Sequence, residues 1–517
     1  MLLARRPEGG EFWTIGDEVI AWIEEHCVLT DSAWIGQPFR VMPWQRRLLL
    51  ELFEVDPETM RRRYRMALVG VGRKNAKSEL AAALALWLAF GQGDASASVY
   101  CAAASEEQAD VVFEKARRMC ELSPTLSRLV RVPEGRRQSS PRIALASNPY
   151  QFVQRLSAKG TTKHGLNPAG VILDELHVWS VQQAEELYQA LTTAMAARPN
   201  GLIFAITTAG SFEADESRCW ALYELGKKVQ AGEVDDPTFF FRWWEAPRDC
   251  RLDDPEAWRA ANPSLGLIMD EDFYRGELVR HPEPYFRRLY LNQWVDIDEA
   301  KFVTEEQLDA CRLERFELRP GEPTWVGVDL SETRDTTAVV LGQMWDGADR
   351  PCGHTGEPCL YVRSKGWAPP RLPDGRRDPE WEVPIDEVRD YLLEVNREYD
   401  VLSNAFDPWH SRLLQQDLER AGVACEEVHA TGARRTGATA LLHQLIAGQR
   451  FHYCDEVLRR HLLNAGVRDE RNGTGYYLVK RRNRAMDMAM ALVNVCYGLE
   501  WAKRQPKKPV IIAWARL

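Results

Sequence analysis

With 517 residues, the chain is too long for one ordinary hydrophobic core, and its length predicts two or three domains. Its 45% hydrophobic and 27% charged content is typical of a soluble globular protein. The sequence contains no run of about 18 apolar residues, which is the length needed to span a membrane. The net charge of −10 argues against a protein that coats nucleic acid, although it allows a local grip on it. Eleven cysteines without disulfide-like spacing, and an N-terminus without the apolar core of a signal peptide, predict a protein of the cytoplasm.

Apolar runs alternate with helical segments from residue 66 to residue 207. The predicted strands are residues 66–71, 97–103, 170–173 and 202–207, and the predicted helices between them are residues 78–90, 106–120 and 181–197. Strands separated by helices pair in parallel through right-handed crossovers. This part of the chain therefore predicts an α/β domain with a parallel sheet.

The first predicted strand leads through a tight loop into a helix that opens on Lys77 and Ser78. In a phosphate-binding loop, backbone N–H groups and the helix N-terminus hold phosphate oxygens, the Lys reaches the β- and γ-phosphates, and the Ser binds Mg²⁺. The two glycines of the usual G-x-x-x-x-G-K-[ST] pattern are replaced here by Val71 and Ala76. Taken alone, the loop favours a nucleotide site no more strongly than a structural turn.

Three further motifs suit a nucleotide site. The strand at 170–173 is followed by Asp174 and Glu175, which could hold the Mg²⁺ shell and polarise the attacking water, or could simply begin a helix. Thr207 and Thr208, at the tip of the next strand, could sense the γ-phosphate or cap a helix. Gln45 offers an amide to an adenine edge, which is weak evidence by itself. The Lys-Ser loop upstream favours the functional interpretation of the two carboxylates.

In this order, the four motifs resemble those of the large terminase subunit of tailed double-stranded DNA bacteriophages, the motor that packages viral DNA. The loop Arg73-Lys74-Asn75-Ala76-Lys77-Ser78 resembles the family's Arg-Lys-Asn-Gly-Lys-Ser form, in which the early glycine is commonly absent, so that only Ala76 departs from it. The family's Pro-Trp-Gln, Gly-Leu-Asn-Pro and Thr-Thr-Ala-Gly motifs are matched at residues 43–45, 165–168 and 207–210.

For this domain the resemblance implies a P-loop ATPase of the ASCE or RecA-like class. The implied ATP-binding residues are Gln45, Arg73, Lys74, Asn75, Ala76, Lys77, Ser78, Asp174, Thr207 and Thr208. Ser78 and Asp174 would hold Mg²⁺, and Glu175 would be catalytic. An arginine from a neighbouring subunit should complete each site, and Arg155 and Arg142 are candidates between which the sequence does not choose.

After residue 213 the pattern loosens, with frequent proline and several tryptophans that we interpret as packing residues. We interpret residues 236–320 as a helical subdomain or linker. It would join an N-terminal region and ATPase domain at residues 1–235 to a second domain at residues 321–517.

The second domain begins with three strands joined by turns, at residues 325–330, 337–344 and 360–367. A helix, a strand and a helix follow at residues 385–396, 401–407 and 411–421, and further helices lie near 437–448 and 485–501. Three antiparallel strands followed by α-β-α is the order of an RNase H-like domain with a mixed sheet.

Two cysteines and a histidine, Cys352, His354 and Cys359, lie close together before the third of these strands. They could bind zinc, but no second pair of ligands follows at finger-like spacing. The pattern therefore favours a polar hairpin tip.

Three aspartates lie in settings that suit metal binding. Asp329 is in the first strand of the second domain, Asp407 ends a later strand, and Asp487 lies on an otherwise apolar helix. Any one of them could cap a helix or pair with an arginine. Together, in RNase H-like order, they predict a site for two Mg²⁺ or Mn²⁺ ions about 4 Å apart, which activate water and stabilise the leaving oxygen in phosphodiester cleavage.

This half also resembles the terminase nuclease domain, whose metal-binding acids map onto Asp329, Asp407 and Asp487. The resemblance adds Asp335 as a candidate for a further metal contact and Lys480 as a candidate contact to the scissile phosphate. It also makes the basic run at residues 480–484 more plausible as a DNA contact than as a solvated face.

As a whole, the resemblance implies that ATP hydrolysis drives double-stranded DNA into procapsids and that a nuclease cuts concatemeric DNA. It implies a pentameric homo-oligomeric ring on the portal protein, a small terminase subunit as partner, and no membrane. The protein would work in the host cytoplasm, docked transiently on the procapsid, and would be absent from the mature virion. A helicase–nuclease of DNA repair or restriction is the alternative, although the further helicase motifs are missing. The intact site residues disfavour a structural capsid-vertex protein with dead sites.

Overall fold

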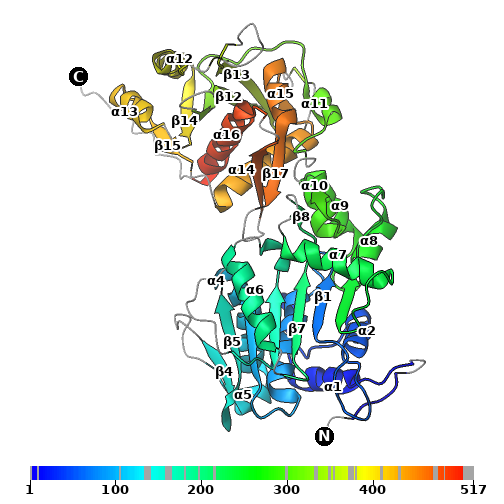
Figure 1. The fold of residues 1–517 in the computed structure, drawn as a ribbon. Helices are drawn as coiled ribbons and strands as arrows, with labels where there is room; N and C mark the ends of the chain where they lie inside the picture. Colours follow the sequence, from blue (N-terminus) through cyan, green and yellow to red (C-terminus); the bar gives the residue numbers. More distant parts are fainter. Residues whose placement is uncertain are drawn as a thin grey trace. The chain divides into compact units, whose positions relative to one another are not determined.

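The computed structural model divides into two compact units (Figure 1). Unit 1 comprises Met1–Arg275 and Phe286–Asp296, and unit 2 comprises Gly276–Tyr285 and Ile297–Leu517. The structure describes residues 3–7, 11–103, 106–132, 141–157, 166–179, 182–195, 198–212, 217–296, 301–330, 336–346, 351–352, 356–370, 378, 381–407, 411–428, 432–469, 475–481 and 484–504. The segment 236–320, interpreted from sequence as a helical subdomain or linker, is shared between the two units, and that interpretation stays a prediction.

The described part of unit 1 is built on an eight-stranded sheet in the order β3-β4-β5-β2-β6-β7-β1-β9. Its strands are β1 (Met66–Gly70), β2 (Ser98–Ala103), β3 (Val130–Arg131), β4 (Arg142–Leu145), β5 (Asn148–Ser157), β6 (Gly170–Asp174), β7 (Leu202–Thr207) and β9 (Phe239–Trp243). All neighbours from β5 to β9 pair in parallel, whereas β3 and β4 form an antiparallel edge. The predicted parallel α/β domain is confirmed. β7 lies between β1 and β6, as in the predicted ATPase class.

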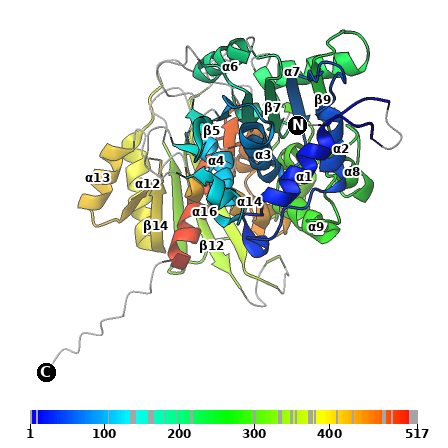
Figure 2. The same ribbon diagram turned by 90° about the horizontal axis from the view of Figure 1, so that it is seen from below.

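Helices cover both faces of this sheet because side chains alternate between two apolar clusters along each strand. Val69 of β1 and Ile206 of β7 belong to one cluster, and Leu68 and Ala205 belong to the other. The helices of this part are α1 (Gly16–His26), α2 (Pro43–Leu52), α3 (Lys77–Leu86), α4 (Glu106–Leu122), α5 (Leu126–Leu129), α6 (Gln182–Ala194), α7 (Arg218–Gln230), α8 (Pro255–Ala261), α9 (Glu271–Arg280) and α10 (Glu283–Tyr290), of which the last two also include residues of unit 2. Figure 2 shows α1 beside α2 and α3 beside α4, in agreement with their contacts. A short strand β8 (Ser211–Phe212) pairs with β10 (Val295–Asp296).

The described part of unit 2 contains a six-stranded sheet in the order β15-β14-β11-β12-β13-β16. Its strands are β11 (Pro323–Asp329), β12 (Thr337–Trp345), β13 (Cys359–Trp367), β14 (Asp400–Phe406), β15 (Cys425–Glu427) and β16 (Phe451–His452), and a separate hairpin pairs β17 (Ala465–Asp469) with β18 (Tyr476–Lys480). β11, β12 and β13 are antiparallel, and β14 pairs in parallel with β11. This order confirms the RNase H-like prediction.

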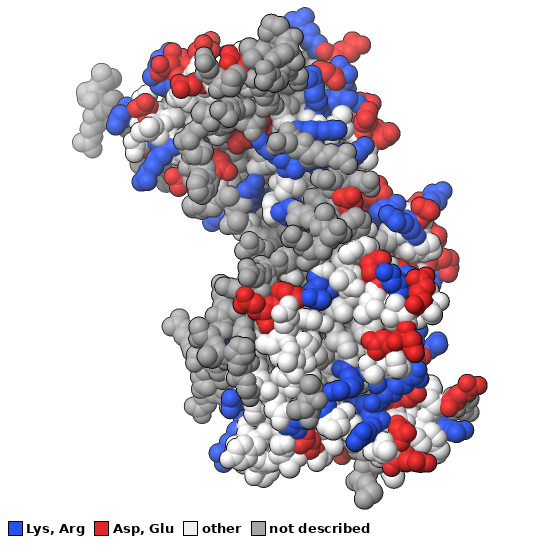
Figure 3. Space-filling model, in the orientation of Figure 1, with Lys and Arg blue, Asp and Glu red and all other residues white. Residues whose placement is uncertain are grey.

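The helices of unit 2 surround that sheet. They are α11 (Glu305–Cys311), α12 (Ile385–Glu398), α13 (Arg412–Arg420), α14 (Ala433–Ala447), α15 (Glu456–Asn464) and α16 (Asp487–Arg504). Among the residues that the structure describes, no helix combines the length and apolar character that crossing a membrane would require. On the face drawn in Figure 3, basic and acidic side chains are interspersed over both units, which fits a local rather than an overall attraction for nucleic acid.

Helix α16 packs directly on β11 because Gly327 leaves room for its backbone. A Cβ at Gly327 would lie 1.9 Å from the carbonyl oxygen of Ala491. One residue along β11, the carbonyl oxygen of Val328 accepts a hydrogen bond of 2.8 Å from Nδ2 of Asn494. These contacts fix the start of α16, and with it Asp487, against the end of β11.

We therefore expect Gly327→Ala to lower the free energy of unfolding of unit 2 by about 1–3 kcal/mol, because α16 must move away from the sheet. Gly437→Ala is the matched control. Gly437 is an exposed glycine of α14 whose added Cβ would meet nothing within 4 Å, so alanine should raise the stability by about 0.5–1 kcal/mol. Calorimetry of both full-length variants measures the difference, and equal stabilities would contradict the tight α16–β11 contact.

Candidate nucleotide and metal sites

The loop between β1 and α3 has the backbone form of a phosphate-binding loop. Ala76 caps α3 in the left-handed region, with φ 56° and ψ 32°, and Lys74 is also left-handed with φ 66°. This conformation costs a residue with a side chain about 1–2 kcal/mol relative to glycine. Ala76 therefore adopts the left-handed conformation for which a phosphate-binding loop normally uses glycine.

The Lys77 side chain lies inside this loop. Its Nζ donates to the carbonyl oxygens of Val71 and Gly72, at 3.2 Å each. Burial lowers the pKa of Lys77, while the nearby charges of Glu175 and Asp174 act against that shift. The ammonium group is thus buried on the loop, and it is close to Asp174 and Glu175, the two carboxylates that the sequence analysis assigned to the same nucleotide site.

Asn75 holds the loop to a distant part of unit 1. Its Nδ2 donates to Oδ1 of Asn262 at 2.9 Å and to the carbonyl oxygen of Gly72 at 3.0 Å. Its Oδ1 accepts from the backbone N–H of Ser264 at 3.0 Å. The Asn75 amide is therefore engaged within the protein, and any contact of this residue with phosphate would come from its backbone N–H. Sequence reasoning missed Asn262 and Ser264, since neither belongs to a local motif.

Gln45 lies on α2 in the predicted adenine motif and is fully buried. Its Oε1 accepts from the backbone N–H of Met42 at 3.0 Å, and its Nε2 has no hydrogen-bond partner among the described residues. The neighbouring Trp44 donates from Nε1 to Oγ of Ser264 at 2.8 Å. A buried donor without a partner costs about 1–3 kcal/mol, and an acceptor on an adenine ring would satisfy it.

Asp174 ends β6, and Glu175 follows in the left-handed conformation with φ 47°. Burial raises the pKa of Asp174, and the charge of Glu175 raises it further. Burial acts in the same direction on Glu175, but Lys77 and His177 outweigh it and hold the pKa of that carboxyl below its usual range. Of the two neighbouring carboxyls, Glu175 is therefore the one whose ionised form the surrounding positive charge favours.

His177 connects Glu175 to Thr207, which ends β7, and to Thr208, which follows it. Its Nδ1 lies 3.1 Å from Oε2 of Glu175 and 2.9 Å from Oγ1 of Thr207, and its backbone N–H donates to the same hydroxyl at 3.2 Å. Oγ1 of Thr208 lies 3.5 Å from that ring nitrogen. Burial lowers the pKa of His177, so the ring is neutral at pH 7. Sequence reasoning missed this residue, and its only signal was its place two residues after Glu175.

We expect His177→Ala to lower the ATPase kcat up to about 100-fold, because Glu175 loses the contact that orients it. Nucleotide affinity should change little, since Lys77 and Gln45 keep their places. Steady-state phosphate release and binding of ATP-γ-S, measured on the same preparation, separate the two effects. An unchanged kcat would show that Glu175 is positioned without His177.

The two candidate arginines lie far across the sheet from the phosphate loop. Arg155, on β5, pairs through Nη1 with Oδ1 of Asp110 at 2.5 Å, and its side chain is 11% exposed. Arg142, on β4, is exposed and donates to Oε1 of Gln154 at 2.7 Å. Four strand spacings separate β5 from β1, about 19 Å at roughly 4.8 Å per strand, so neither arginine lies near its own loop.

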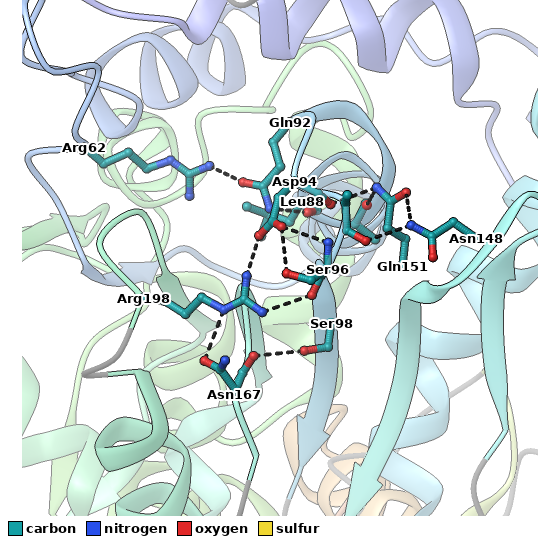
Figure 4. Close-up of polar contacts among 12 residues, drawn as sticks. Arg62, Leu88, Gln92, Asp94, Ser96, Ser98, Asn148, Gln151, Asn167 and Arg198 are labelled. Atoms are coloured by element: carbon teal, nitrogen blue, oxygen red, sulfur yellow. Dashed lines mark hydrogen bonds and ion pairs between the residues drawn. The ribbon is translucent and has the colours of Figure 1, made fainter.

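The Gly-Leu-Asn-Pro motif lies at the opposite end of the strands from Asp174. Oδ1 of Asn167 accepts from Nε of Arg198 at 3.1 Å, and its carbonyl oxygen accepts from Oγ of Ser98 at 3.1 Å (Figure 4). Nη1 of Arg198 pairs with Oδ2 of Asp94 at 2.5 Å. These contacts tie the amino ends of β2, β6 and β7 together, so this motif supports the sheet. Gly165 lies outside the described residues.

The three aspartates of unit 2 meet at one edge of its sheet. Asp329 ends β11, Asp407 directly follows the parallel strand β14, and Asp487 opens α16. Burial raises the pKa of Asp329 to about 8, and the charges of Asp487 and Asp407 raise it further. Lys480, at the end of β18, places Nζ 3.4 Å from Oδ1 of Asp487. Asp335 lies outside the described residues.

Carboxylates that repel one another in a buried place need cations to be ionised together. Oxygen ligands of this kind suit Mg²⁺ and Mn²⁺, so the residues present fit the predicted metals. The parallel pairing of β11 with β14 and the packing of α16 on β11 place the ends that carry the three predicted aspartates close together.

Comparisons with known proteins identify the family of this chain. The family model of the terminase large subunit ATPase domain matches residues 43–228, and that of its endonuclease domain matches residues 233–349. The chain is 31% identical over 426 residues to the terminase large subunit of Enterobacteria phage HK97, which covers 80% of each chain. The chain belongs to the terminase large subunits.

Two further relatives extend this comparison. The large terminase of a thermophilic bacteriophage has a similar fold, with a TM-score of 0.50, 15% identity, and coverage of 83% of this chain and 93% of that one. Protein YmfN of Escherichia coli strain K12 is 26% identical over 203 residues, 36% of this chain and 43% of its own. The two matched family models give this terminase large subunit an ATPase domain and an endonuclease domain, and the helicase–nuclease alternative is not favoured.

Proposed function

We propose that ATP hydrolysis in unit 1 of this terminase large subunit drives double-stranded DNA into procapsids and that unit 2 cuts concatemeric DNA with two metal ions. The observation that carries the motor part is the chain of contacts from Glu175 through His177 to Thr207. The observation that carries the nuclease part is the trio of aspartates around Asp329.

In the ATPase site, Lys77 would neutralise the β- and γ-phosphates, and Ser78 and Asp174 would hold Mg²⁺. The backbone of residues 73–76 would donate to phosphate oxygens, and Gln45 would bind adenine. The metal would neutralise charge on the phosphates. Glu175 would accept a hydrogen bond from the attacking water. The structure of the large terminase of the thermophilic bacteriophage in complex with ATP-γ-S supports this assignment by analogy of fold alone.

The presence or absence of the γ-phosphate would affect the rest of unit 1 through the Thr-Thr-Ala-Gly motif at residues 207–210. Thr207 and Thr208 contact His177, and the next backbone N–H, of Ala209, donates to Oδ1 of Asn292 at 2.7 Å. Nδ2 of Asn292 donates in turn to the carbonyl oxygen of Trp244 at 2.7 Å. A shift at Glu175 would therefore be passed to the segment around Asn292, which follows α10.

In the nuclease site, Asp329, Asp407 and Asp487 would hold two Mg²⁺ or Mn²⁺ ions, with Asp335 as a further candidate ligand. The ions would activate water and stabilise the leaving oxygen. Lys480, close to Asp487, would contact the scissile phosphate. The pairing of this lysine with a carboxylate keeps its ammonium at the edge of the trio.

We infer that the protein works as a homo-oligomeric, pentameric ring on the portal protein of the procapsid, together with a small terminase subunit. The distance of Arg155 and Arg142 from their own phosphate loop supports a role in trans for one of them, and the exposed Arg142 has the more accessible guanidinium group. The working place would be the host cytoplasm, with transient docking on the procapsid and absence from the mature virion.

A packaging assay tests this function. The purified chain is mixed with portal-bearing procapsids, the small subunit, linear double-stranded DNA and ATP, and the DNA that survives added DNase is measured. We expect protection that requires ATP and procapsids together. ATP-dependent strand separation without protected DNA would instead support a helicase–nuclease.

A further inference from the structure

Unit 2 contains a second group of metal-ligand atoms, separate from the aspartates. Among the described residues, Cys352, Cys359 and His452 each offer one ligand atom, and these atoms all lie within 4.8 Å of one another. Cys359 is fully buried and His452 is 3% exposed. Both cysteines are in the thiol form. The sequence pattern favoured a polar hairpin tip for Cys352, His354 and Cys359 and gave no sign of His452, and His354 lies outside the described residues.

The sheet brings these residues together from distant parts of the sequence. Cys359 begins β13, and Cys352 precedes it in the connection from β12. β16 pairs in parallel with β13, with His452 opposite Tyr361. Since side chains two apart on a strand share a face, Cys359 and Tyr361 lie on the face that His452 also uses.

The spacing of the sulfurs suits a tetrahedral ion. The Sγ atoms of Cys352 and Cys359 are 3.8 Å apart. Two thiolates bound at about 2.3 Å to a tetrahedral zinc ion are themselves about 3.8 Å apart. All three ligand atoms lie within 4.8 Å of one another, so the imidazole would complete three of the four positions after moving closer to the ion.

The surroundings prepare the ligands for metal. Nδ1 of His452 lies 3.2 Å from the carbonyl oxygen of Cys311, which can only accept, so Nδ1 carries the proton and Nε2 keeps its lone pair. Metal-binding histidines are usually oriented in this way. The hydroxyl of Tyr361 donates to Sγ of Cys352 at 2.9 Å, as a donor to a thiolate would.

We propose that Cys352, Cys359 and His452 bind one structural zinc ion, with a fourth ligand such as water. Thiolate and imidazole ligands select zinc over the Mg²⁺ or Mn²⁺ that suit the aspartates. The ion would fasten the β12–β13 connection to the two-residue edge strand β16, and through Cys311 to α11.

This zinc site is remote from the nuclease chemistry. In the register of β12, Ala338 pairs with Asp329 and Trp345 pairs with Cys359. Seven residues at roughly 3.4 Å each separate these two ends by about 24 Å. The zinc ion should therefore support the fold of unit 2, and its ligands should not be needed for cleavage chemistry itself.

Metal analysis of the purified full-length protein tests the proposal. After growth with zinc and dialysis against a mild chelator, we expect one zinc per wild-type chain, a loss of most of it in Cys359→Ser and His452→Ala, and full retention in Cys454→Ser. Cys454 is an exposed thiol two residues from His452 and serves as the matched control. Tyr361→Phe keeps all three ligands and should weaken zinc binding by about 10–100-fold, which keeps the test valid if a ligand variant fails to fold.

Cobalt substitution distinguishes this site from the aspartates. Co²⁺ bound to thiolates gives a sulfur-to-metal charge-transfer band and intense visible bands, whereas carboxylate ligands give neither. We expect these bands in wild type and Cys454→Ser and their loss in Cys359→Ser. A wild-type protein without zinc or cobalt bands, equal zinc in Cys359→Ser, or a Cys352–Cys359 disulfide shown by mass and thiol counting would each overturn the proposal.

Discussion

Glu175→Gln is expected to lower the ATPase kcat of the full-length protein by about 10²–10⁴-fold and to abolish DNA packaging. The amide has the shape of the carboxylate but not its charge, so it orients and polarises water far less well. The contacts that would hold ATP are unchanged, because Lys77, Ser78 and Gln45 remain. Phosphate release, binding of ATP-γ-S and DNase protection measure the three consequences, and metal-dependent cutting of DNA should persist.

Two comparisons make this result specific. Lys77→Ala should lose nucleotide binding as well as hydrolysis, because the buried ammonium on the phosphate loop is removed. Glu121→Gln, on α4, changes a partly exposed carboxylate that pairs with Arg117 and should leave the rate unchanged. If Glu175→Gln kept the full rate, Glu175 would not be the residue that acts on water.

The sequence alone was enough to predict those parts of the candidate ATPase site whose residues lie close together along the chain. The strands before Lys77 and Asp174 are apolar runs, and each motif directly follows its strand, so strand and motif are found together. The bonds of Asn75 to Asn262 and of Ala209 to Asn292 cross 187 and 83 residues. No local pattern marks such partners, and the segment that contains them was interpreted as a helical subdomain or linker.

Several elements were missed because their local pattern is weak. β9, at Phe239–Trp243, lies in a region where only the tryptophans were noted, as packing residues, and it becomes a strand because β1 offers it an open edge. The left-handed angles of Ala76 were equally unpredictable, because alanine prefers the right-handed helix and only the surrounding loop imposes them.

In unit 2 the order of elements was enough to predict the strands β11 to β14 and the three candidate aspartates, whereas β15 and β16 were not predicted. Asp487 was recognisable because an isolated carboxylate on an apolar helix requires a partner. The hairpin of β17 and β18, which positions Lys480, was not predicted. His452 was missed because only the pairing of β16 with β13 brings it to Cys359.

Asp329→Asn is expected to reduce metal-dependent DNA cleavage by about 10³-fold or more, the size of loss that follows removal of a charge-stabilising group at a reacting centre, while ATPase activity persists. The neutral amide is a poor ligand for hard cations, and the two remaining aspartates cannot replace it. Plasmid cutting with Mn²⁺ measures the loss. Asp386→Asn is the control, because the Asp386 side chain is 86% exposed on α12 and pairs with Arg389.

The same substitution should stabilise the metal-free protein, which an incidental structural role of Asp329 would not predict. Its pKa is raised to about 8 in the folded state, so folding opposes the ionised form that the unfolded chain prefers above a pH of about 4. The gain from asparagine should therefore be absent below about pH 4, grow up to about pH 8 and then level off, as thermal unfolding in chelator would show. Added Mn²⁺ should raise the unfolding temperature of the wild type but not of Asp329→Asn. Cleavage that persists in Asp329→Asn, or equal stabilisation of both proteins by Mn²⁺, would show that Asp329 is not a metal ligand.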